Sequence, residues 1–128
     1  MAKIKTLSFK EACKKTGHHP VKSLPYPKPA NKDEEAYNAL KRLEILNEAY
    51  CMVRGKKWVV DYSNSNQAKW RAWYYYDSSL RAFVFGDTDL DCTYADAGTG
   101  SRHVSRTSEI AEHMATAHIE EWNKWLLK

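Results

Sequence analysis

Apolar residues recur every three or four positions in the second quarter of the chain, which is typical of a helix that buries one stripe. The stripe consists of Ala36, Tyr37, Leu40, Leu43, Leu46 and Tyr50. Asn31 precedes it as a potential N-cap, and Asp33 and Glu34 place negative charge in the first turn, where the helix dipole favours it. The pattern predicts a long helix that starts after Asn31 and ends between Cys51 and Gly55.

A second stripe of helical period lies near the C-terminus. Thr107 is the expected N-cap of this helix, and Glu109 suits its first turn. The apolar face comprises Ala111, Met114, Ala115, His118, Trp122, Trp125 and Leu126. We expect one continuous helix here, with Trp122 and Trp125 supplying much of its buried area in the core.

The N-terminal region predicts a short helix and an extended connector. Ser8 and Glu11 have the spacing of a capping box, and Gly17 suits a left-handed position after the last turn, near Thr16. Prolines at positions 20, 25, 27 and 29 follow. Because proline fixes φ and lacks an amide donor, this stretch favours an extended conformation.

The middle of the chain alternates in the manner of β-strands. Trp58–Tyr62, residues 68–76 and residues 80–85 are the expected strands, with a hairpin turn at residues 77–79 and room for a short strand at 92–94. The predicted fold class is therefore α+β. A small antiparallel sheet of three or four strands packs against two main helices, preceded by the short N-terminal helix and the Pro-rich connector.

Length and composition favour one soluble globular domain. The chain has 128 residues, 28% of them charged, and a net charge of +4 that is spread along the sequence. We expect a single domain over residues 1–128, with 1–17 as a helical arm, 18–30 as the connector and 31–128 as the α+β core. The sequence contains no run of roughly 18 apolar residues, so no membrane span is expected. The N-terminus is too polar for a signal peptide.

Cysteine spacing and metal motifs argue against a metal centre. The three cysteines are far apart and form no C-x-x-C pair, so reduced thiols in the cytoplasm are expected; they are Cys13, Cys51 and Cys92. Alternating aspartates at 87, 89 and 91 suggest a calcium loop, but the positions that need Gly and Glu hold Cys92 and Gly98. His113 and His118 are about 140° apart on a helix, unlike the paired histidines of zinc helices.

No motif for catalysis is present either. The sequence contains no nucleophile elbow, P-loop or dinucleotide-binding glycine pattern. We therefore predict that the protein is not an enzyme, that it has no catalytic or metal-binding residues, and that it uses no cofactor.

The aromatic hairpin has two interpretations. In a strand, Arg71, Trp73 and Tyr75 point to one face, while Trp70, Ala72, Tyr74 and Tyr76 point to the other. Such a sheet can be covered by helices on one face and partly by loops on the other. Alternatively, one face flanked by arginines can stack bases or another planar ligand. The candidate binding face is Arg71, Trp73, Tyr75, Arg81 and Arg102, although Arg102 also fits a structural salt bridge.

Two blocks of the chain form a recognisable pattern: Asp61–Gln67 with Lys69 and Trp73, and Gly100–Arg102 followed by Thr107–Glu112. These blocks resemble those of a family of small uncharacterised proteins from bacteriophages and prophages of gut bacteria. Residues 103–106 depart from the family, which is more apolar there. The family has no established activity, so the resemblance implies a phage or mobile-element origin and little about mechanism.

Two function classes remain open. The first is a non-enzymatic phage or prophage accessory protein in the bacterial cytoplasm or the virion, which acts through protein contacts that include self-association. The second is a small module that binds single-stranded nucleic acid through the aromatic and arginine face. No membrane partner is expected. An exposed apolar patch without basic residues would favour the first class, and a basic groove lined by Trp and Tyr would favour the second.

Overall fold

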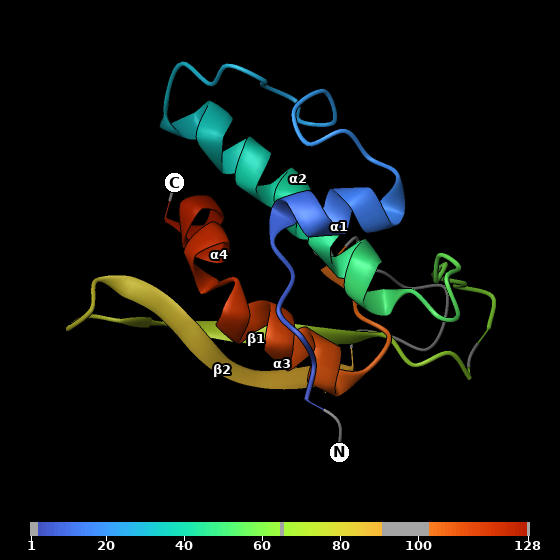
Figure 1. The fold of residues 1–128 in the computed structure, drawn as a ribbon. Helices are drawn as coiled ribbons and strands as arrows, with labels where there is room; N and C mark the ends of the chain where they lie inside the picture. Colours follow the sequence, from blue (N-terminus) through green and yellow to red (C-terminus); the bar gives the residue numbers. More distant parts are fainter. Residues whose placement is uncertain (1–2, 65, 91–102, 128) are drawn as a thin grey trace.

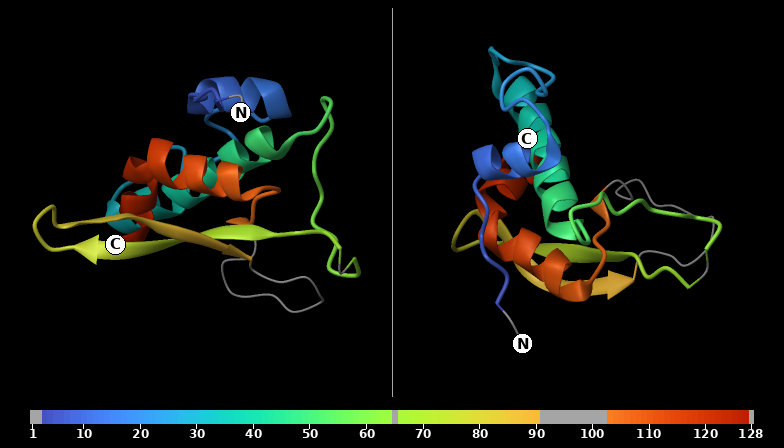
Figure 2. Two further views of the ribbon diagram at one scale, coloured as in Figure 1. Left: turned by 90° about the horizontal axis from the view of Figure 1, so that it is seen from below. Right: turned by 45° about the vertical axis from the view of Figure 1, so that its right-hand side comes forward.

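A computed structural model describes residues 3–64, 66–90 and 103–127. It is an α+β structure in which four helices lie on one side of a two-stranded antiparallel hairpin (Figure 1). The elements are α1 (Phe9–Thr16), α2 (Lys32–Cys51), β1 (Trp70–Asp77), β2 (Ala82–Leu90), α3 (Ser108–Ala117) and α4 (Ile119–Leu126). The hairpin forms one outer layer and α1 lies on the opposite side of the molecule, with the other helices between them (Figure 2).

Local signals confirm the first two helices. In α1, Ser8 Oγ accepts the Glu11 amide at 3.1 Å, Glu11 Oε1 accepts the Ser8 amide at 3.0 Å, and Gly17 is left-handed with φ 82°. In α2, Asn31 Oδ1 accepts the Glu34 amide at 2.9 Å. Each of these caps satisfies amides that have no partner inside the helix, so the helix starts are encoded locally.

The prediction of one continuous C-terminal helix is wrong. The chain breaks at His118, where φ is −116° and ψ is 30°, and α4 starts in a new direction. The break frees carbonyls in the last turn of α3, and the indole Nε1 of Trp122 donates to one of them, Met114 O, at 3.2 Å. The new direction brings α4 against α2, where Arg42 pairs with Glu121 at 2.6 Å and with Glu35 at 2.6 Å.

The expected first strand is also wrong. Trp58–Tyr62 forms no strand, because side-chain groups satisfy its backbone. Gln67 Oε1 accepts the Asp61 amide at 2.6 Å, and Gln67 Nε2 donates to Val59 O at 2.8 Å. The expected strand near residues 92–94 lies outside the described residues. The sheet of the described residues therefore has two strands, fewer than the predicted three or four.

The hairpin itself is confirmed, with an irregularity that the sequence did not reveal. Asp77 Oδ1 accepts the Ser79 amide at 2.9 Å and so fixes the turn. The register shifts between Trp73, which is opposite Asp87, and Tyr74, which is opposite Phe85, and this leaves Gly86 as a β-bulge. A Cβ at Gly86 would lie 3.2 Å from Trp73 O, so the bulge suits glycine.

The core lies between α1, α2 and α3. Its buried cluster consists of Ala12, Cys13, Leu43, Ile45, Leu46, Ala49, Cys51, Ile110 and Met114. The C-terminal region enters the core mainly through α3, whereas α4 has no fully buried residue and Trp122 packs half-buried at the edge. Trp122, Trp125 and Leu126, which were expected to carry much of the apolar area of this region, are half-buried. The connector is held to α2 by Asn38, whose amide bonds the Tyr26 amide at 3.0 Å and its carbonyl at 2.7 Å.

Candidate functional site

A buried asparagine on α2 positions the start of β1. Asn47 Nδ2 donates to Val104 O at 2.8 Å, and Asn47 Oδ1 accepts the Ser105 hydroxyl at 2.6 Å. Ser105 in turn forms an antiparallel bridge with Trp70, with N···O distances of 2.9 and 2.7 Å. Asn47 therefore links the start of β1 to the core through Ser105, which lies three residues before the start of α3.

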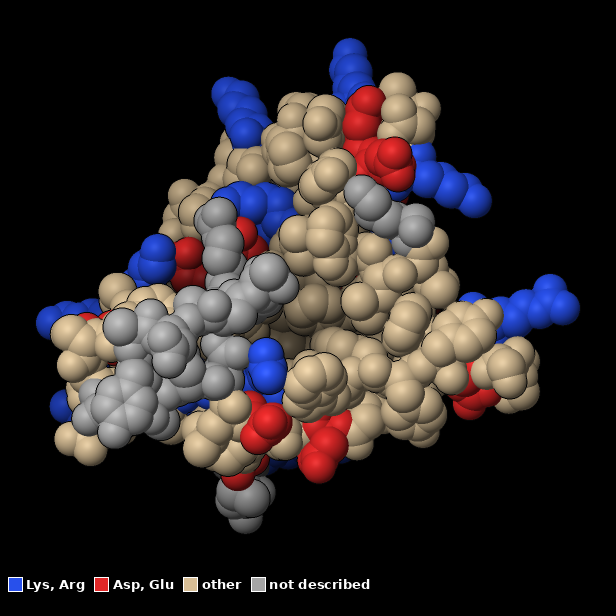
Figure 3. Space-filling view, turned by 180° about the vertical axis from the view of Figure 1, so that it is seen from behind, with Lys and Arg blue, Asp and Glu red and all other residues tan. Residues whose placement is uncertain are grey.

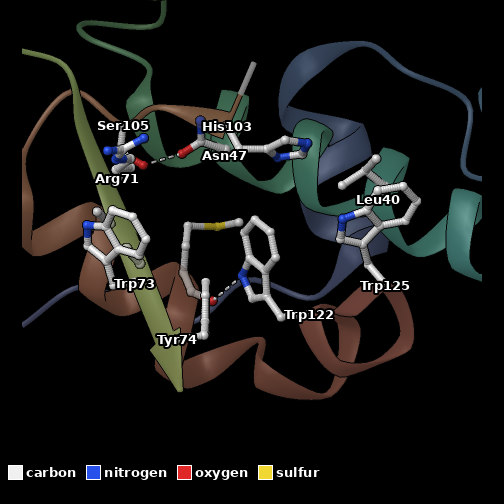
Figure 4. Close-up of a pocket in the computed structure, with 12 residues that line it drawn as sticks. Leu40, Asn47, Arg71, Trp73, Tyr74, His103, Ser105, Trp122 and Trp125 are labelled. Atoms are coloured by element: carbon white, nitrogen blue, oxygen red, sulfur yellow. Dashed lines mark hydrogen bonds between the residues drawn. The ribbon is translucent and has the colours of Figure 1, made fainter. Parts of the chain in front are cut away.

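A hollow of about 270 Å³ lies between β1, α2 and α4 (Figures 3 and 4). Trp122 projects into it from α4, with its ring 5.2 Å from that of Tyr74 (Figure 4). The lining is mainly aromatic and apolar, with polar groups at one end: Leu40, Asn47, Arg71, Ala72, Trp73, Tyr74, His103, Ser105, Ala111, Met114, Trp122 and Trp125.

The hydroxyl of Tyr74 is a buried polar group in the lining of the hollow. It is buried and has no hydrogen-bond partner among the residues that the structure describes. Burial raises the pKa of this phenol well above its ordinary value, so it stays protonated and can donate. A ligand or an added segment in the hollow could satisfy it.

The hairpin face is defined here as Arg71, Trp73 and Tyr75. These three predicted residues do share one face of β1, and Trp73 and Tyr75 are 53% and 58% exposed. The Arg71 guanidinium stacks on the Trp73 ring, with Cζ 4.7 Å from the ring centroid. Stacking of this kind holds a half-buried cation against an aromatic ring that is itself more than half exposed.

The other two predicted site residues do not join this face. Arg81 lies in the turn beyond β1 with φ 53°, and the neighbouring Phe83 is opposite Tyr76, on the other face of the sheet. The expectation that Arg71 and Arg81 flank one face therefore fails. Arg102 lies outside the described residues.

Two carboxylates on β2 belong to the same face as Arg71. Asp87 is opposite Trp73 and Asp89 is opposite Arg71, and both side chains are exposed. The strand expected from the sequence ends at residue 85, so both aspartates fell outside the predicted sheet, whereas β2 continues to Leu90. With Asp77 at the end of β1, the face therefore carries one arginine and three carboxylates, so its local charge is negative.

The break at His118 also creates a histidine cluster. His113 and His118 are brought to a ring separation of 6.4 Å, and both rings pack on Tyr50. The Tyr50 hydroxyl accepts the Leu7 amide at 2.8 Å and lies 2.8 Å from His118 Nε2. Burial lowers the pKa of both histidines, and the pKa of His118 is lowered further by His113.

The described histidines, cysteines and carboxylates give little support for a metal site or a reactive thiol. Within residues 3–64, 66–90 and 103–127, no three His, Cys, Asp or Glu side chains gather as a potential metal site. Cys13 and Cys51 are free and buried, and burial raises the pKa of both thiols, which disfavours the reactive thiolate. Cys92 lies outside the described part of the chain.

Comparison with protein-family models, with curated proteins and with solved structures found no match. Among the helices of the described residues, none combines the length and apolarity needed to cross a bilayer. Function is therefore argued from the hairpin face and the hollow.

Proposed function

We propose that the protein is a small non-enzymatic accessory protein of phage or prophage type, which acts through protein contacts made by its hairpin. The observation that carries this proposal is the exposure of Trp73 and Tyr75 beside a stacked arginine. Trp, Tyr and Arg are the residues that most often dominate the binding energy of protein interfaces. Leaving two large aromatic rings in water is unfavourable, and a partner that covers them recovers that free energy.

Binding of single-stranded nucleic acid is the second candidate. The stacked pair of Arg71 and Trp73 favours it, because proteins bind single strands through aromatic rings and nearby cations. Asp87 and Asp89 oppose it, since their carboxylates share the face and repel phosphates. A net charge of +4 spread along the chain does not compensate for this local repulsion. Protein contact is therefore the preferred function.

The phage origin and the bacterial cytoplasm or virion as location rest on the sequence resemblance of the two blocks. In the structure, the first block folds on itself: Asp61 Oδ1 accepts the Ser63 amide at 3.0 Å, and Asn64 Oδ1 accepts the Asn66 amide at 2.9 Å. These turns give the block a structural role in the loop before β1, which is compatible with a shared fold in the family.

Site-specific photo-crosslinking tests the proposal. A photoreactive phenylalanine replaces Tyr75 in chains produced in bacterial cells, and the matched control carries the same group at Lys10, which is exposed on α1. We expect protein adducts of defined mass from position 75, none from position 10, and their loss when Trp73→Ala is added. Adducts to nucleic acid alone, removed by nuclease, would overturn the proposal in favour of the second candidate. An absence of any adduct would overturn both.

A titration with labelled single-stranded oligonucleotides provides an independent check. At low salt, where phosphate contacts are strongest, we expect no binding at tens of micromolar protein. Binding that falls steeply with salt and is lost in Arg71→Ala would establish the nucleic-acid function instead.

A further inference from the structure

At the edge of β1 that faces away from β2, backbone groups have no partner among the described residues. The amide and carbonyl of Trp70 bond Ser105, so they point to this edge. Alternate residues of an antiparallel strand direct their backbone groups to the same side, so Ala72, Tyr74 and Tyr76 present theirs there too. No described residue bonds these groups. An unpaired strand edge of this kind is a template for another strand.

The hollow lies along this same edge. It separates β1 from α2, with Tyr74 on one wall and Leu40 on the other (Figure 4). It opens to the surface on the face seen from behind (Figure 3). A strand added to β1 would extend the sheet beneath α2, contact the apolar lining, and approach the buried Tyr74 hydroxyl that lacks a partner.

The free edge is self-complementary. It runs from Arg71, next to the bridge at Trp70, to Asp77, where the turn starts, and its centre is Tyr74. If a second copy pairs antiparallel about Tyr74, Arg71 lies opposite Asp77 of the second copy, and Trp73 lies opposite Tyr75 of the second copy. The pairs then join opposite charges and aromatic rings, which are favourable cross-strand neighbours. Ala72 lies opposite Tyr76 of the second copy, so a small side chain faces a large one.

Other registers fit less well. The backbone groups that point to the free edge belong to even-numbered residues of β1. An antiparallel pair of copies must therefore match even-numbered residues with even-numbered residues, which limits the registers that are possible. Centring the two-fold axis on Trp73 would place Tyr76 opposite Trp70, where Ser105 already pairs. Centring it on Tyr75 would place Arg71 and Ala72 opposite residues of the turn. The register about Tyr74 is therefore the one that uses the whole free edge.

We propose that a second copy of this chain binds at the free edge of β1, in antiparallel register about Tyr74, to form a continuous four-stranded sheet. This inference rests on the proposed function, since it names the partner of the hairpin. The charge complementarity of Arg71 and Asp77 and the length of the free edge favour a second copy over a peptide of unrelated sequence.

Cysteine cross-linking tests the register, in a Cys92→Ser background. Ala72 and Tyr76 of the second copy would form a hydrogen-bonded pair with Cα atoms about 5.5 Å apart, which is within disulfide range. We expect a mixture of Ala72→Cys and Tyr76→Cys chains to form a disulfide-linked dimer under mild oxidation. Each variant alone is the matched control, because its two copies lie about 13 Å apart along the strands and cannot be bridged.

Sedimentation velocity of the unmodified chain gives the second measurement. We expect a dimer at tens of micromolar, and at least tenfold weaker association for Ala72→Pro, which removes an outward amide and no bond to β2. Circular dichroism is the control that tests whether this variant remains folded. A monomer at all concentrations, or a dimer unaffected by Ala72→Pro, would overturn the inference, as would failure of the mixed pair to cross-link.

The failures of the two proposals are distinguishable. A monomeric chain whose position 75 still cross-links to a different protein retains the proposed function and loses only the second copy as partner. A chain that neither dimerises nor cross-links to any protein loses both. Cross-linked product from position 75 at twice the mass of the chain supports both together.

Discussion

Replacing Asn47 by aspartate isolates the contact that ties β1 to the core. The change keeps the size of the side chain and the acceptor that binds the Ser105 hydroxyl, but it removes the donor to Val104 O. Asn47 is 7% exposed, so water cannot replace that hydrogen bond efficiently. A buried carbonyl left without a donor costs about 1–3 kcal/mol, and burying a partly ionised carboxyl adds to this. We expect Asn47→Asp to lower the free energy of unfolding by about 2–4 kcal/mol at neutral pH.

The pH dependence of this variant provides an internal check. Burial and the nearby Val104 carbonyl raise the pKa of the introduced carboxyl in the folded state above its value in the unfolded chain. The folded variant therefore binds the proton more tightly, and its stability relative to the parent increases as the pH falls. Once protonated, the carboxyl can also donate to Val104 O. The stability gap should narrow on acidification from neutral pH.

Urea unfolding, followed by tryptophan fluorescence at several pH values, measures both effects. The matched control is Asn31→Asp, the same chemical change at the exposed N-cap of α2, where a carboxylate caps well and the change should stay within about 0.5 kcal/mol. A loss below about 1 kcal/mol for Asn47→Asp at neutral pH, or a gap that does not depend on pH, would refute the reasoning.

Three further predictions concern other parts of the fold. Trp122→Ala should lower the free energy of unfolding by about 2–4 kcal/mol in urea, because it removes a half-buried ring and its hydrogen bond; an unchanged midpoint would contradict this. Burial lowers the pKa of His113 and His118, so the folded chain binds fewer protons than the unfolded chain and loses stability as the pH falls through the pKa of unfolded histidine. The melting temperature of the His113→Asn, His118→Gln double variant should therefore change less with pH than that of the parent. Gly86→Ala should cost about 1–3 kcal/mol, because its Cβ meets Trp73 O at 3.2 Å, and melting at the parent temperature would disprove this.

The parts of the fold that depend on short-range signals were predictable. The capping box at Ser8, the N-cap at Asn31 and the turn at Asp77 each act within a few residues, and all three are confirmed. The grouping of Arg71 and Trp73 on one face followed from the two-residue period of a strand.

The parts that depend on distant partners were not predictable. Alternation made Trp58–Tyr62 resemble a strand, but a strand also needs a neighbour, and Gln67 satisfies this backbone instead. The break at His118 is coupled to contacts of α4 with α2, which periodicity within one helix does not report. The bulge at Gly86 changes which β2 residues share a face with Arg71, and so it places Asp87 and Asp89 on the candidate binding face.

Asn123 makes the two edges of the hairpin different, and this difference bears on aggregation. Its carboxamide accepts the Phe83 amide at 2.7 Å and donates to the Phe83 carbonyl at 2.9 Å, and thereby imitates a peptide group of a neighbouring strand. A two-stranded ribbon with both edges open could add copies at either side and grow into fibrils. Because Asn123 already bonds the outward amide and carbonyl of Phe83, another strand cannot pair along the whole β2 edge, and antiparallel pairing at the β1 edge uses up that edge in both copies. The dimer then adds no further copies, and the exposed aromatic hairpin does not nucleate a fibril in the cell.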